Sequence, residues 1–387
     1  MVNGAETGHH RTYIAAKANQ VSGFLLIALA AVVLWAITRF YLRGEDLSRY
    51  DRPGAMAIGD SREPSAEHHA VVQLFSQMGE KASGVSGKRR LTVMREMMDA
   101  MGEDADLSGI EVTSVDVAGV PGEWVCATDA NPARRLLYLH GGAFTMGSPK
   151  SHRAITSKFS RIAGASVLAV DYRLMPENRR IDCLTDCQTA YRWILENGPA
   201  GAEPVQTLFV AGDSAGGNLT LAVIAWARDA GLRAADAVVA LSPATDGTFT
   251  SPSLLANLAT DHMLGPLIGR ILKIPNSLML WISWASNRLP PSDPRISPLH
   301  GDLSGLPPTL VHASEAEMLL DDARRYVGKA SDAGSAASLE TWHHMLHVWH
   351  VFEQRLPEAQ EAFEHIERFL ELMAPRMLEQ STAEPVD

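Results

Sequence analysis

Cysteine is scarce in this sequence, and its few occurrences exclude a disulfide framework. The 387 residues contain three cysteines, Cys126, Cys183 and Cys187, and a small odd number of this kind argues against structural disulfides. None of the three takes part in the spacing of a metal site, so no metal ligand is expected. Cys183 and Cys187 lie four residues apart, on one face if the segment is helical, and we expect both to be buried as small apolar side chains.

Positive charge is also in short supply, and no internal repeat is visible. Lysine and arginine together number 34 against 45 aspartates and glutamates, which gives a net charge of −11. Binding to nucleic acid requires clustered positive charge, so nucleic acid is excluded as the main partner. The length suits one large α/β domain with an inserted or appended subdomain.

The long hydrophobic run of this sequence lies close to its N-terminus. Residues 1–20 are polar, and residues 21–38 carry no charge and are long enough to span a bilayer as a helix. Hydrophobicity on all sides of this segment argues against a buried core helix. We expect a single transmembrane anchor or an uncleaved signal. The alternative is a cleaved signal and a secreted protein, although Ala36, Ile37 and Thr38 form a poor cleavage site.

The charges on the two flanks of this run give only a direction for its orientation. Arg11 and Lys17 precede the run, and a larger set of cations, diluted by three acidic residues, follows it: Arg39, Arg43, Arg49 and Arg52. Positive charge tends to remain in the cytoplasm, so this distribution favours a cytoplasmic location for the residues after the run and leaves the exported side open.

The rest of the chain divides by composition and periodicity. Eight strand-like runs alternate with helical segments, which predicts a mostly parallel sheet with helices on both faces. A stretch rich in apolar residues interrupts them and is too hydrophobic to be a free linker. The expected segments are a linker (39–65), N-terminal helices (66–109), the sheet core (110–245 and 295–375), an apolar insertion (246–294) and a tail (376–387).

The most distinctive stretch joins an apolar run to a turn rich in glycine. Residues 208–211 lead into Gly212-Asp213-Ser214-Ala215-Gly216, and a helix-compatible apolar run follows. A strand, a sharp turn and a helix in this order expose the serine hydroxyl at the apex of the turn. The alternative is an ordinary glycine-rich loop. A serine nucleophile also needs a base, a group that orients the base, and preformed donors for an oxyanion.

Candidates for each of these parts occur along the chain. Residues 141–143 offer backbone N–H groups before the serine. An acidic cluster follows the strand-like run that ends at Ala313: Glu315, Glu317, Asp321 and Asp322. A histidine cluster follows the run that ends at Trp342: His343, His344, His347 and His350.

These motifs resemble those of the hormone-sensitive lipase-like branch of the α/β-hydrolase superfamily, a group of bacterial carboxylesterases. The matching motifs are HGGAF (140–144), DYRLMPE (171–177), GDSAGGN (212–218), LPPTLVHASEAEMLLDDARRY (306–326) and MLHVWHVF (345–352). They extend over about residues 110 to 370. The resemblance implies an α/β-hydrolase fold with a mostly parallel eight-stranded sheet and ester hydrolysis without a cofactor. It also implies a helical cap, made of N-terminal cap helices (66–109) and the cap insertion (246–294).

The resemblance also assigns the catalytic residues. Ser214 corresponds to the nucleophile and His347 to the base. The family usually has aspartate at the acid position, where this sequence has Glu317, and the triad tolerates either acid. Asp321, one helical turn further along, is the alternative acid.

The same resemblance places the oxyanion hole at the backbone N–H groups of Gly141, Gly142, Ala143 and Ala215. Ala143 stands where the family often has glycine. Its N–H group remains, but a positive φ at this position would strain an alanine. Gly142 and Ala215 are therefore the safer donors.

The implied function is a serine carboxylesterase that hydrolyses short- to medium-chain esters through an acyl-enzyme. The alternatives are an amidase, a peptidase or a lipid-directed lipase with the same triad. In a different class, the fold could bind a ligand without catalysis, or serve as a partner of other proteins at the membrane surface. Besides the ester, the expected partners are a membrane, through residues 21–38, and as a further candidate a second copy of the chain in a homodimer.

Overall fold

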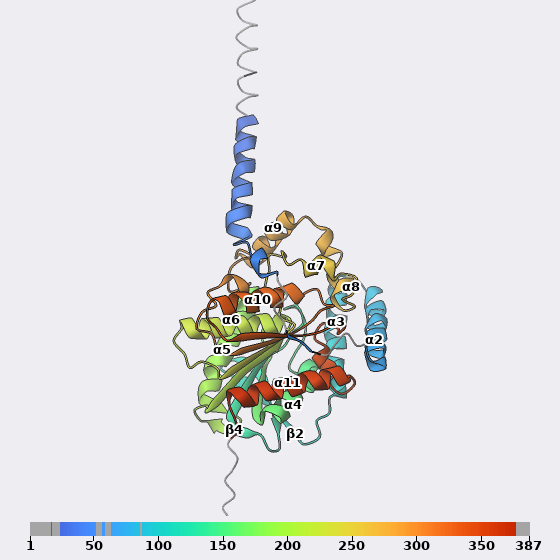
Figure 1. The fold of residues 1–387 in the computed structure, drawn as a ribbon, viewed down its shortest axis with the longest axis vertical. Helices are drawn as coiled ribbons and strands as arrows, with labels where there is room; N and C mark the ends of the chain where they lie inside the picture. Colours follow the sequence, from blue (N-terminus) through green and yellow to red (C-terminus); the bar gives the residue numbers. More distant parts are fainter. Residues whose placement is uncertain (1–16, 18–23, 52–55, 59–62, 86, 377–387) are drawn as a thin grey trace, which may run out of the picture.

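A twisted, mostly parallel sheet occupies the centre of the molecule, with helices on both of its faces (Figure 1). The computed structural model describes residues 17, 24–51, 56–58, 63–85 and 87–376. The polar segment 1–20 apart from Lys17, the first residues of the apolar run (21–23) and residues 377–387 of the expected tail lie outside the described residues.

The sheet has nine strands in the described part of the chain, in the order β1-β11-β10-β9-β8-β4-β5-β3-β2. The pairs β2–β3 and β3–β5 are antiparallel, and the other neighbouring strands are parallel. The eight predicted strands are confirmed, and the two-residue β1 adds a ninth at the edge. The bounds are β1 (Met56–Ala57), β2 (Ile110–Val117), β3 (Val120–Ala127), β4 (Asn131–Leu139), β5 (Ala165–Val170), β8 (Thr207–Asp213), β9 (Ala237–Leu241), β10 (Thr309–Ser314) and β11 (Ala337–Trp342).

Helices cover both faces of this sheet and form the cap. The strands β6 (Asn197–Gly198) and β7 (Gly201–Ala202) form a separate small hairpin. The helices are α2 (Ala66–Ser83), α3 (Gly87–Met101), α4 (Arg153–Ala163), α5 (Arg180–Glu196), α6 (Ala215–Asp229), α7 (Ser253–Ala256), α8 (Leu264–Ile268), α9 (Asn276–Asn287), α10 (Leu320–Asp332) and α11 (Pro357–Met373).

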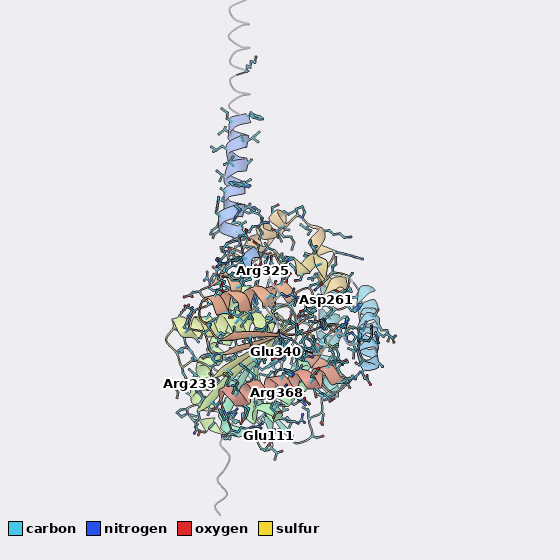
Figure 2. All side chains as sticks on the ribbon, viewed as in Figure 1. Glu111, Arg233, Asp261, Arg325, Glu340 and Arg368 are labelled. Atoms are coloured by element: carbon cyan, nitrogen blue, oxygen red, sulfur yellow. The ribbon has the colours of Figure 1, made fainter. Side chains whose placement is uncertain are left out.

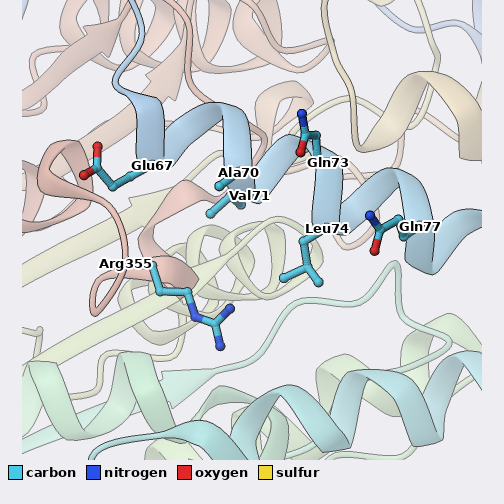
Figure 3. A pocket seen from close by; sticks show the side chains of 7 residues that line it. All are labelled: Glu67, Ala70, Val71, Gln73, Leu74, Gln77 and Arg355. Atoms are coloured by element: carbon cyan, nitrogen blue, oxygen red, sulfur yellow. The ribbon is translucent and has the colours of Figure 1, made fainter.

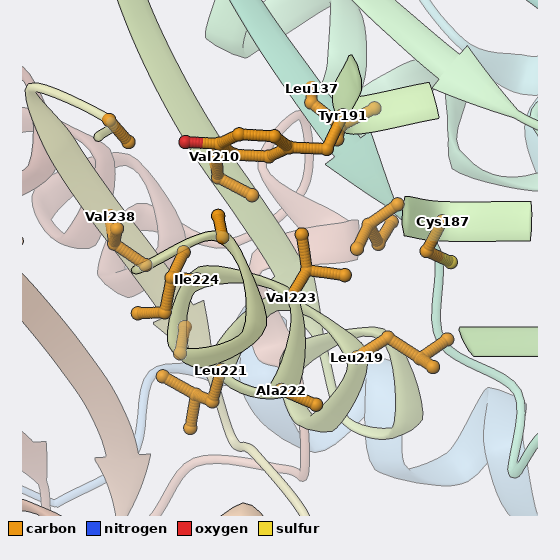
Figure 4. Close-up of a cluster of buried hydrophobic side chains, with 14 of the residues drawn as sticks. Leu137, Cys187, Tyr191, Val210, Leu219, Leu221, Ala222, Val223, Ile224 and Val238 are labelled. Carbon is orange, nitrogen blue, oxygen red and sulfur yellow. The ribbon is translucent and has the colours of Figure 1, made fainter. Parts of the chain in front are cut away.

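Side chains that alternate along the strands fill two separate cores. Leu137 of β4 belongs to the core beneath α5, α6 and α10, whereas Leu136 and Tyr138 belong to the core beneath α4 and α11. Figure 4 shows the first core, where strand residues such as Leu137 and Val210 meet the apolar side chains of α6. Cys183 and Cys187 lie on α5, buried and unpaired, as predicted.

Residues 39–65 carry more structure than the linker that we expected. A short 3₁₀ turn, η2 (Ser48–Tyr50), follows the apolar helix, and β1 pairs with β11. The Asp51 carboxylate accepts two hydrogen bonds from the Arg325 guanidinium on α10. Composition alone predicts a loop here, but isolated apolar side chains still fill gaps in the domain. Three of them are buried: Leu42, Leu47 and Tyr50.

The apolar N-terminal helix, Phe24–Leu42, stands out from the domain on the side of the cap (Figure 1). It is long and apolar enough to cross a membrane, and almost none of it is buried. Its last turn widens into a π-helix, η1 (Ile37–Leu42), where it reaches α9. The helix therefore meets the domain only at its C-terminal end.

The insertion at residues 246–294 forms the short helices α7 and α8 and the longer α9. Leu254 of α7 packs on Met318 and Leu319, the two residues that precede α10. Leu258, Leu264 and other apolar side chains of the insertion surround this contact. The insertion therefore lies against the loop that follows β10.

The start of α6 crosses the end of β4 with no room for a side chain at Gly216. A β-carbon there would lie 1.9 Å from the Leu139 carbonyl oxygen and 2.5 Å from that of His140. Only glycine allows this approach. The crossing brings the turn at Ser214 beside the loop that follows His140.

Replacing Gly216 by alanine should destabilise the protein by about 3 kcal/mol, because the new methyl group overlaps a fixed backbone carbonyl. Gly84→Ala is the matched control, since nothing lies within 4 Å of a β-carbon at that position. The measurement is the free energy of unfolding from urea titrations of the two variants and the wild type. Equal stability of Gly216→Ala and Gly84→Ala would contradict the close crossing.

Candidate active site

Ser214 occupies a strained turn between β8 and α6. Its φ is 52° and its ψ is −114°, a conformation that costs a residue with a side chain about 1–3 kcal/mol. The turn is held because the Ser214 N–H donates to the Leu241 carbonyl at 2.7 Å. In turn, the Ser214 carbonyl accepts from the N–H groups of Asn218 and Ala244. The serine side chain is half-buried at the apex of this turn.

Ser214, His347 and Glu317 form one continuous chain of hydrogen bonds. Ser214 Oγ donates to His347 Nε2 at 2.9 Å, and His347 Nδ1 donates to Glu317 Oε2 at 2.7 Å. His347 and Glu317 are almost fully shielded from solvent. The structure thus brings together the three residues that the sequence offered as nucleophile, base and acid.

Glu317 reaches the histidine because the turn after β10 holds its carboxylate. Its second oxygen, Oε1, accepts from the Ser314 N–H at 2.9 Å. Asp321, the alternative acid, lies on α10 and is engaged elsewhere. Its carboxylate accepts from the Ser253 N–H at 2.8 Å and from Arg324 at 3.2 Å.

Two polar side chains of the cap insertion hold the loop that carries Glu317 in place. Asn257 donates to the main-chain carbonyls of Glu315 and Glu317 at 2.9 and 2.8 Å. Asp261, which is buried, accepts from the Met318 N–H at 2.9 Å. The position of the acid therefore depends on the cap as well as on the sheet.

The surroundings of His347 favour its charged form. Burial disfavours an imidazolium, but the hydrogen bond to Glu317 and the negative charges of Glu317, Asp261 and Asp213 outweigh it. The pKa of His347 is therefore raised above the ordinary value of 6.5. Such an environment stabilises the imidazolium that forms when the histidine accepts a proton.

The other histidines of the cluster lie away from the serine. His350 Nε2 is hydrogen-bonded to His312 Nδ1 at 3.1 Å, and burial holds the pKa of His350 well below its ordinary value. His344 is exposed, and His343 is half-buried. Among the described residues, His347 is the histidine that contacts Ser214 Oγ.

Three of the four expected oxyanion donors remain available. The N–H groups of Gly142, Ala143 and Ala215 donate to no acceptor within the described part of the chain. The φ angles of Gly142 and Ala143 are 110° and 53°. Ala143 therefore carries the backbone strain that a glycine at this position would avoid.

Gly141, the fourth expected oxyanion donor, differs from the other three. Its N–H donates to Asp213 Oδ1 at 2.9 Å and is therefore occupied. A β-carbon at Gly141 would also lie 2.0 Å from Asp213 Oδ2, so this glycine permits the close approach. The motif makes three consecutive N–H groups look equivalent, but a carboxylate distant in sequence takes the first.

The Asp213 carboxylate that accepts from this loop also contacts two buried side chains. Tyr138 Oη donates to it at 2.7 Å, and His152 Nε2 lies 3.4 Å away. Burial alone would raise the pKa of Asp213, but the charge and hydrogen bond of His152 and the hydrogen bond of Tyr138 lower it. For His152, burial is outweighed by Asp213, and its pKa is raised. The carboxylate of Asp213, the residue before the serine, is therefore occupied by structural contacts.

The side chain of Phe144, at the end of the same loop, packs against a buried arginine. The guanidinium carbon of Arg180 lies 3.1 Å from the centre of the Phe144 ring, and Arg180 donates to Asn218 Oδ1 at 2.6 Å. Burial lowers the pKa of Arg180 to about 10. Asn218 Nδ2 donates to the carbonyls of Ala244 and Ile296, which flank the cap insertion on its two sides. These contacts join the loop that follows His140, helix α6 and the two ends of the cap insertion.

Two hollows on the surface lie apart from these catalytic candidates. Figure 3 shows the one along α2, lined by Glu67, Ala70, Val71, Gln73, Leu74, Gln77 and Arg355. The other is lined by Met175, Pro176, Glu177, Asn178, Arg179, Asp182 and Ser286. In the described residues, no cluster of three or more His, Cys, Asp or Glu side chains has the arrangement of a metal site. The candidate site is therefore defined by the chemistry around Ser214.

Sequence reasoning did not find Asn257, Asp261 or Arg180. Asn257 and Asp261 had a signal, because they are polar residues four apart among the leucines and alanines of residues 254–259 and the apolar pair 263–264. Arg180 had none, since a charged residue at the start of a helix is ordinarily exposed.

Comparison with known proteins places this geometry in a family. Residues 136–351 match the family model described as alpha/beta hydrolase fold. An acetyl-hydrolase of Streptomyces hygroscopicus is 38% identical over 263 residues, which cover 66% of this chain and 81% of that protein. Two solved structures match over about four fifths of this chain. An esterase/lipase from an uncultured bacterium has 36% identity and a TM-score of 0.68, with 80% of this chain and 99% of that chain covered.

The second is an esterase from the bacterial hormone-sensitive lipase family. It is 34% identical, with a TM-score of 0.69, and the match covers 81% of this chain and 99% of that chain. The relatives found by sequence and those found by structure belong to the family that the motifs around Ser214 and His347 indicate. The chain belongs to the alpha/beta hydrolase fold family, in its hormone-sensitive lipase-like branch.

Proposed function

We propose that this protein is a serine carboxylic-ester hydrolase that works through an acyl-enzyme. The observation that carries the proposal is the hydrogen-bonded chain from Ser214 through His347 to Glu317. The names of its relatives, an acetyl-hydrolase and several esterases, support the same reaction and favour short- to medium-chain esters.

In the first half-reaction, Ser214 Oγ attacks the ester carbonyl carbon while His347 Nε2 takes the hydroxyl proton. The tetrahedral intermediate collapses, the bond to the alcohol oxygen breaks, and the imidazolium gives its proton to the leaving alcohol. Water then attacks the acyl-enzyme with His347 as base, which releases the carboxylic acid and restores the serine. Glu317 keeps the Nδ1–H tautomer and stabilises the imidazolium.

We assign the developing oxyanion to the N–H groups of Gly142, Ala143 and Ala215. Ala215 is the first residue of α6, so the positive end of that helix faces the same position. Fixed donors of this kind act on the charge that appears in the transition state, where they contribute most to the rate. The strain at Ala143 supports this role, because the backbone is held in a conformation that alanine disfavours.

We further propose that residues 21–38 form a retained membrane anchor. Trp281 Nε1 of the cap donates to Thr38 Oγ1 at 2.9 Å, and Leu42 is fully buried. A cleaved signal would leave that indole without its partner, which favours retention. The cations after the helix favour a cytoplasmic catalytic domain.

Replacing Ser214 by alanine should lower kcat for p-nitrophenyl butyrate by about 10⁶-fold, because the nucleophile is lost. The measurement is release of p-nitrophenol by the full chain, with circular dichroism as the check on folding. An anilide with the same acyl group, assayed in parallel, separates an esterase from an amidase. Equal turnover by the variant and the wild type would exclude the proposed function.

The acid is tested by a pair of amide substitutions on neighbouring positions. Glu317→Gln should lower kcat by about 10⁴-fold, because a neutral amide does not stabilise the imidazolium or fix its tautomer. Asp321→Asn should keep turnover within a few-fold of the wild type, as its carboxylate serves Ser253 and Arg324. The opposite pattern would move the assignment to Asp321.

The pH profile follows from the raised pKa of His347. Only the neutral imidazole accepts the serine proton, so kcat/KM should fall as pH decreases, with a midpoint above 6.5. Asp261→Asn should move that midpoint to lower pH, because it removes a negative charge that favours the imidazolium. The measurement is kcat/KM for a soluble ester across the acid range. A midpoint that stays in place or rises in Asp261→Asn would contradict this account.

A further inference from the structure

The helices of the cap are apolar on both sides. In α8, Leu264 and Ile268 pack toward Met318 beneath the cap. Leu267, on the other side of the same helix, is 42% exposed. A surface helix of a water-soluble domain normally has a polar outer side, and a helix that is apolar all round is typical of burial or of a membrane environment.

The same pattern recurs in α9. Met279 and Leu280 are buried, whereas Leu278 and Ile282, which lie four residues apart along one side of the helix, are 51% and 48% exposed. Ile271, between the two helices, is also exposed. We call the set Leu267, Ile271, Leu278 and Ile282 the outer cap face. Large exposed apolar side chains that recur within one segment of a folded domain indicate an interaction site.

The segment that carries the outer cap face is basic, in contrast to the chain as a whole. Residues 262–292 contain Arg270, Lys273 and Arg288 and no acidic residue, although the whole chain has a net charge of −11. All three cations are exposed, and within residues 17, 24–51, 56–58, 63–85 and 87–376 none of them forms an ion pair. This surface complements a partner that is both apolar and negatively charged.

The outer cap face adjoins the base of the apolar helix. Besides the contact of Trp281 with Thr38, Arg43 donates to Asn276 Oδ1 at 3.1 Å, and Ser292 Oγ donates to the Tyr41 carbonyl at 3.2 Å. Figure 1 shows the helix leaving the molecule beside α9, on the side where the cap lies. A bilayer crossed by this helix would therefore meet the cap.

We propose that the outer cap face rests on an anionic lipid bilayer, with its apolar side chains in the interface and its three cations among the headgroups. This inference rests on the membrane anchor proposed above and adds a second contact with the membrane. Amphipathic helices that lie in the interface combine buried apolar area with attraction to anionic lipid in this way. Each cation near such a surface changes the docked-to-undocked ratio by about fivefold.

The test places an environment-sensitive fluorophore on the full chain. Leu278→Cys carries the fluorophore at the outer cap face, and Leu372→Cys is the matched control on α11, where the leucine is 73% exposed. Both are made with Cys126→Ser, because Cys126 is only half-buried while Cys183 and Cys187 are buried. Each protein is reconstituted into phosphatidylcholine vesicles with and without phosphatidylglycerol.

With phosphatidylglycerol, the emission at position 278 should shift to the blue and be quenched by spin-labelled lipid, and the emission at position 372 should do neither. Added salt, or the triple variant Arg270→Glu, Lys273→Glu and Arg288→Glu, should reverse the shift. Arg368→Glu, on α11 away from the cap (Figure 2), should leave it unchanged. Identical emission at the two positions, or a shift at 278 that is insensitive to lipid charge, would overturn the proposal.

Two further measurements separate this inference from those on which it rests. Flotation with the vesicles reports the anchor, and a protein that floats without the shift at position 278 would refute only the cap contact. Hydrolysis of soluble p-nitrophenyl butyrate reports the active site and should be the same in all labelled and charge-reversed variants. A shift that appears in detergent and grows with protein concentration would indicate a second copy of the chain and would overturn the proposal.

Discussion

The site depends on one close approach of backbones, at Gly216. Because α6 begins against the carbonyls of Leu139 and His140, the turn at Ser214 and the loop to which we assign the oxyanion donors are parts of one contact. The Asp213 carboxylate adds to this contact by accepting a hydrogen bond from the Gly141 N–H. Packing of the sheet core offsets the cost of the strained backbone at Ser214 and Ala143. The serine hydroxyl and the N–H groups proposed as oxyanion donors are therefore positioned before any substrate arrives.

The acid comes to this arrangement from a different direction. Glu317 lies on a turn after β10 that Asn257 and Asp261 of the cap hold in place, and Asp261 also adds to the negative charge around His347. The insertion thus does more than cover the sheet: it fixes the geometry and the electrostatics of the base. The longer side chain of a glutamate is accommodated because its second oxygen is held by the Ser314 N–H.

Local patterns in the sequence predicted the eight strands, the turn at Ser214, and the acidic and histidine clusters, because strand periodicity and loop motifs involve neighbouring residues. The choice of Glu317 and His347 within those clusters came from the resemblance to the family. Local patterns failed where a residue distant in sequence decides. Gly141 was expected as an oxyanion donor, but Asp213, which lies 72 positions later, occupies its N–H. The buried contacts of Leu42, Leu47 and Tyr50 within a segment of loop composition likewise depend on α10 and other elements far along the chain. No motif reports such pairings.

The apolar helix joins the cap directly, without a linker between them. Leu42 is already buried in the domain, and Trp281 contacts Thr38 within the helix itself, so the catalytic domain begins where the helix ends. Under the proposed membrane anchor, an enzyme built in this way would have a short reach. Its working volume would be a layer about as thick as the domain, and it would search for substrate by lateral diffusion in two dimensions.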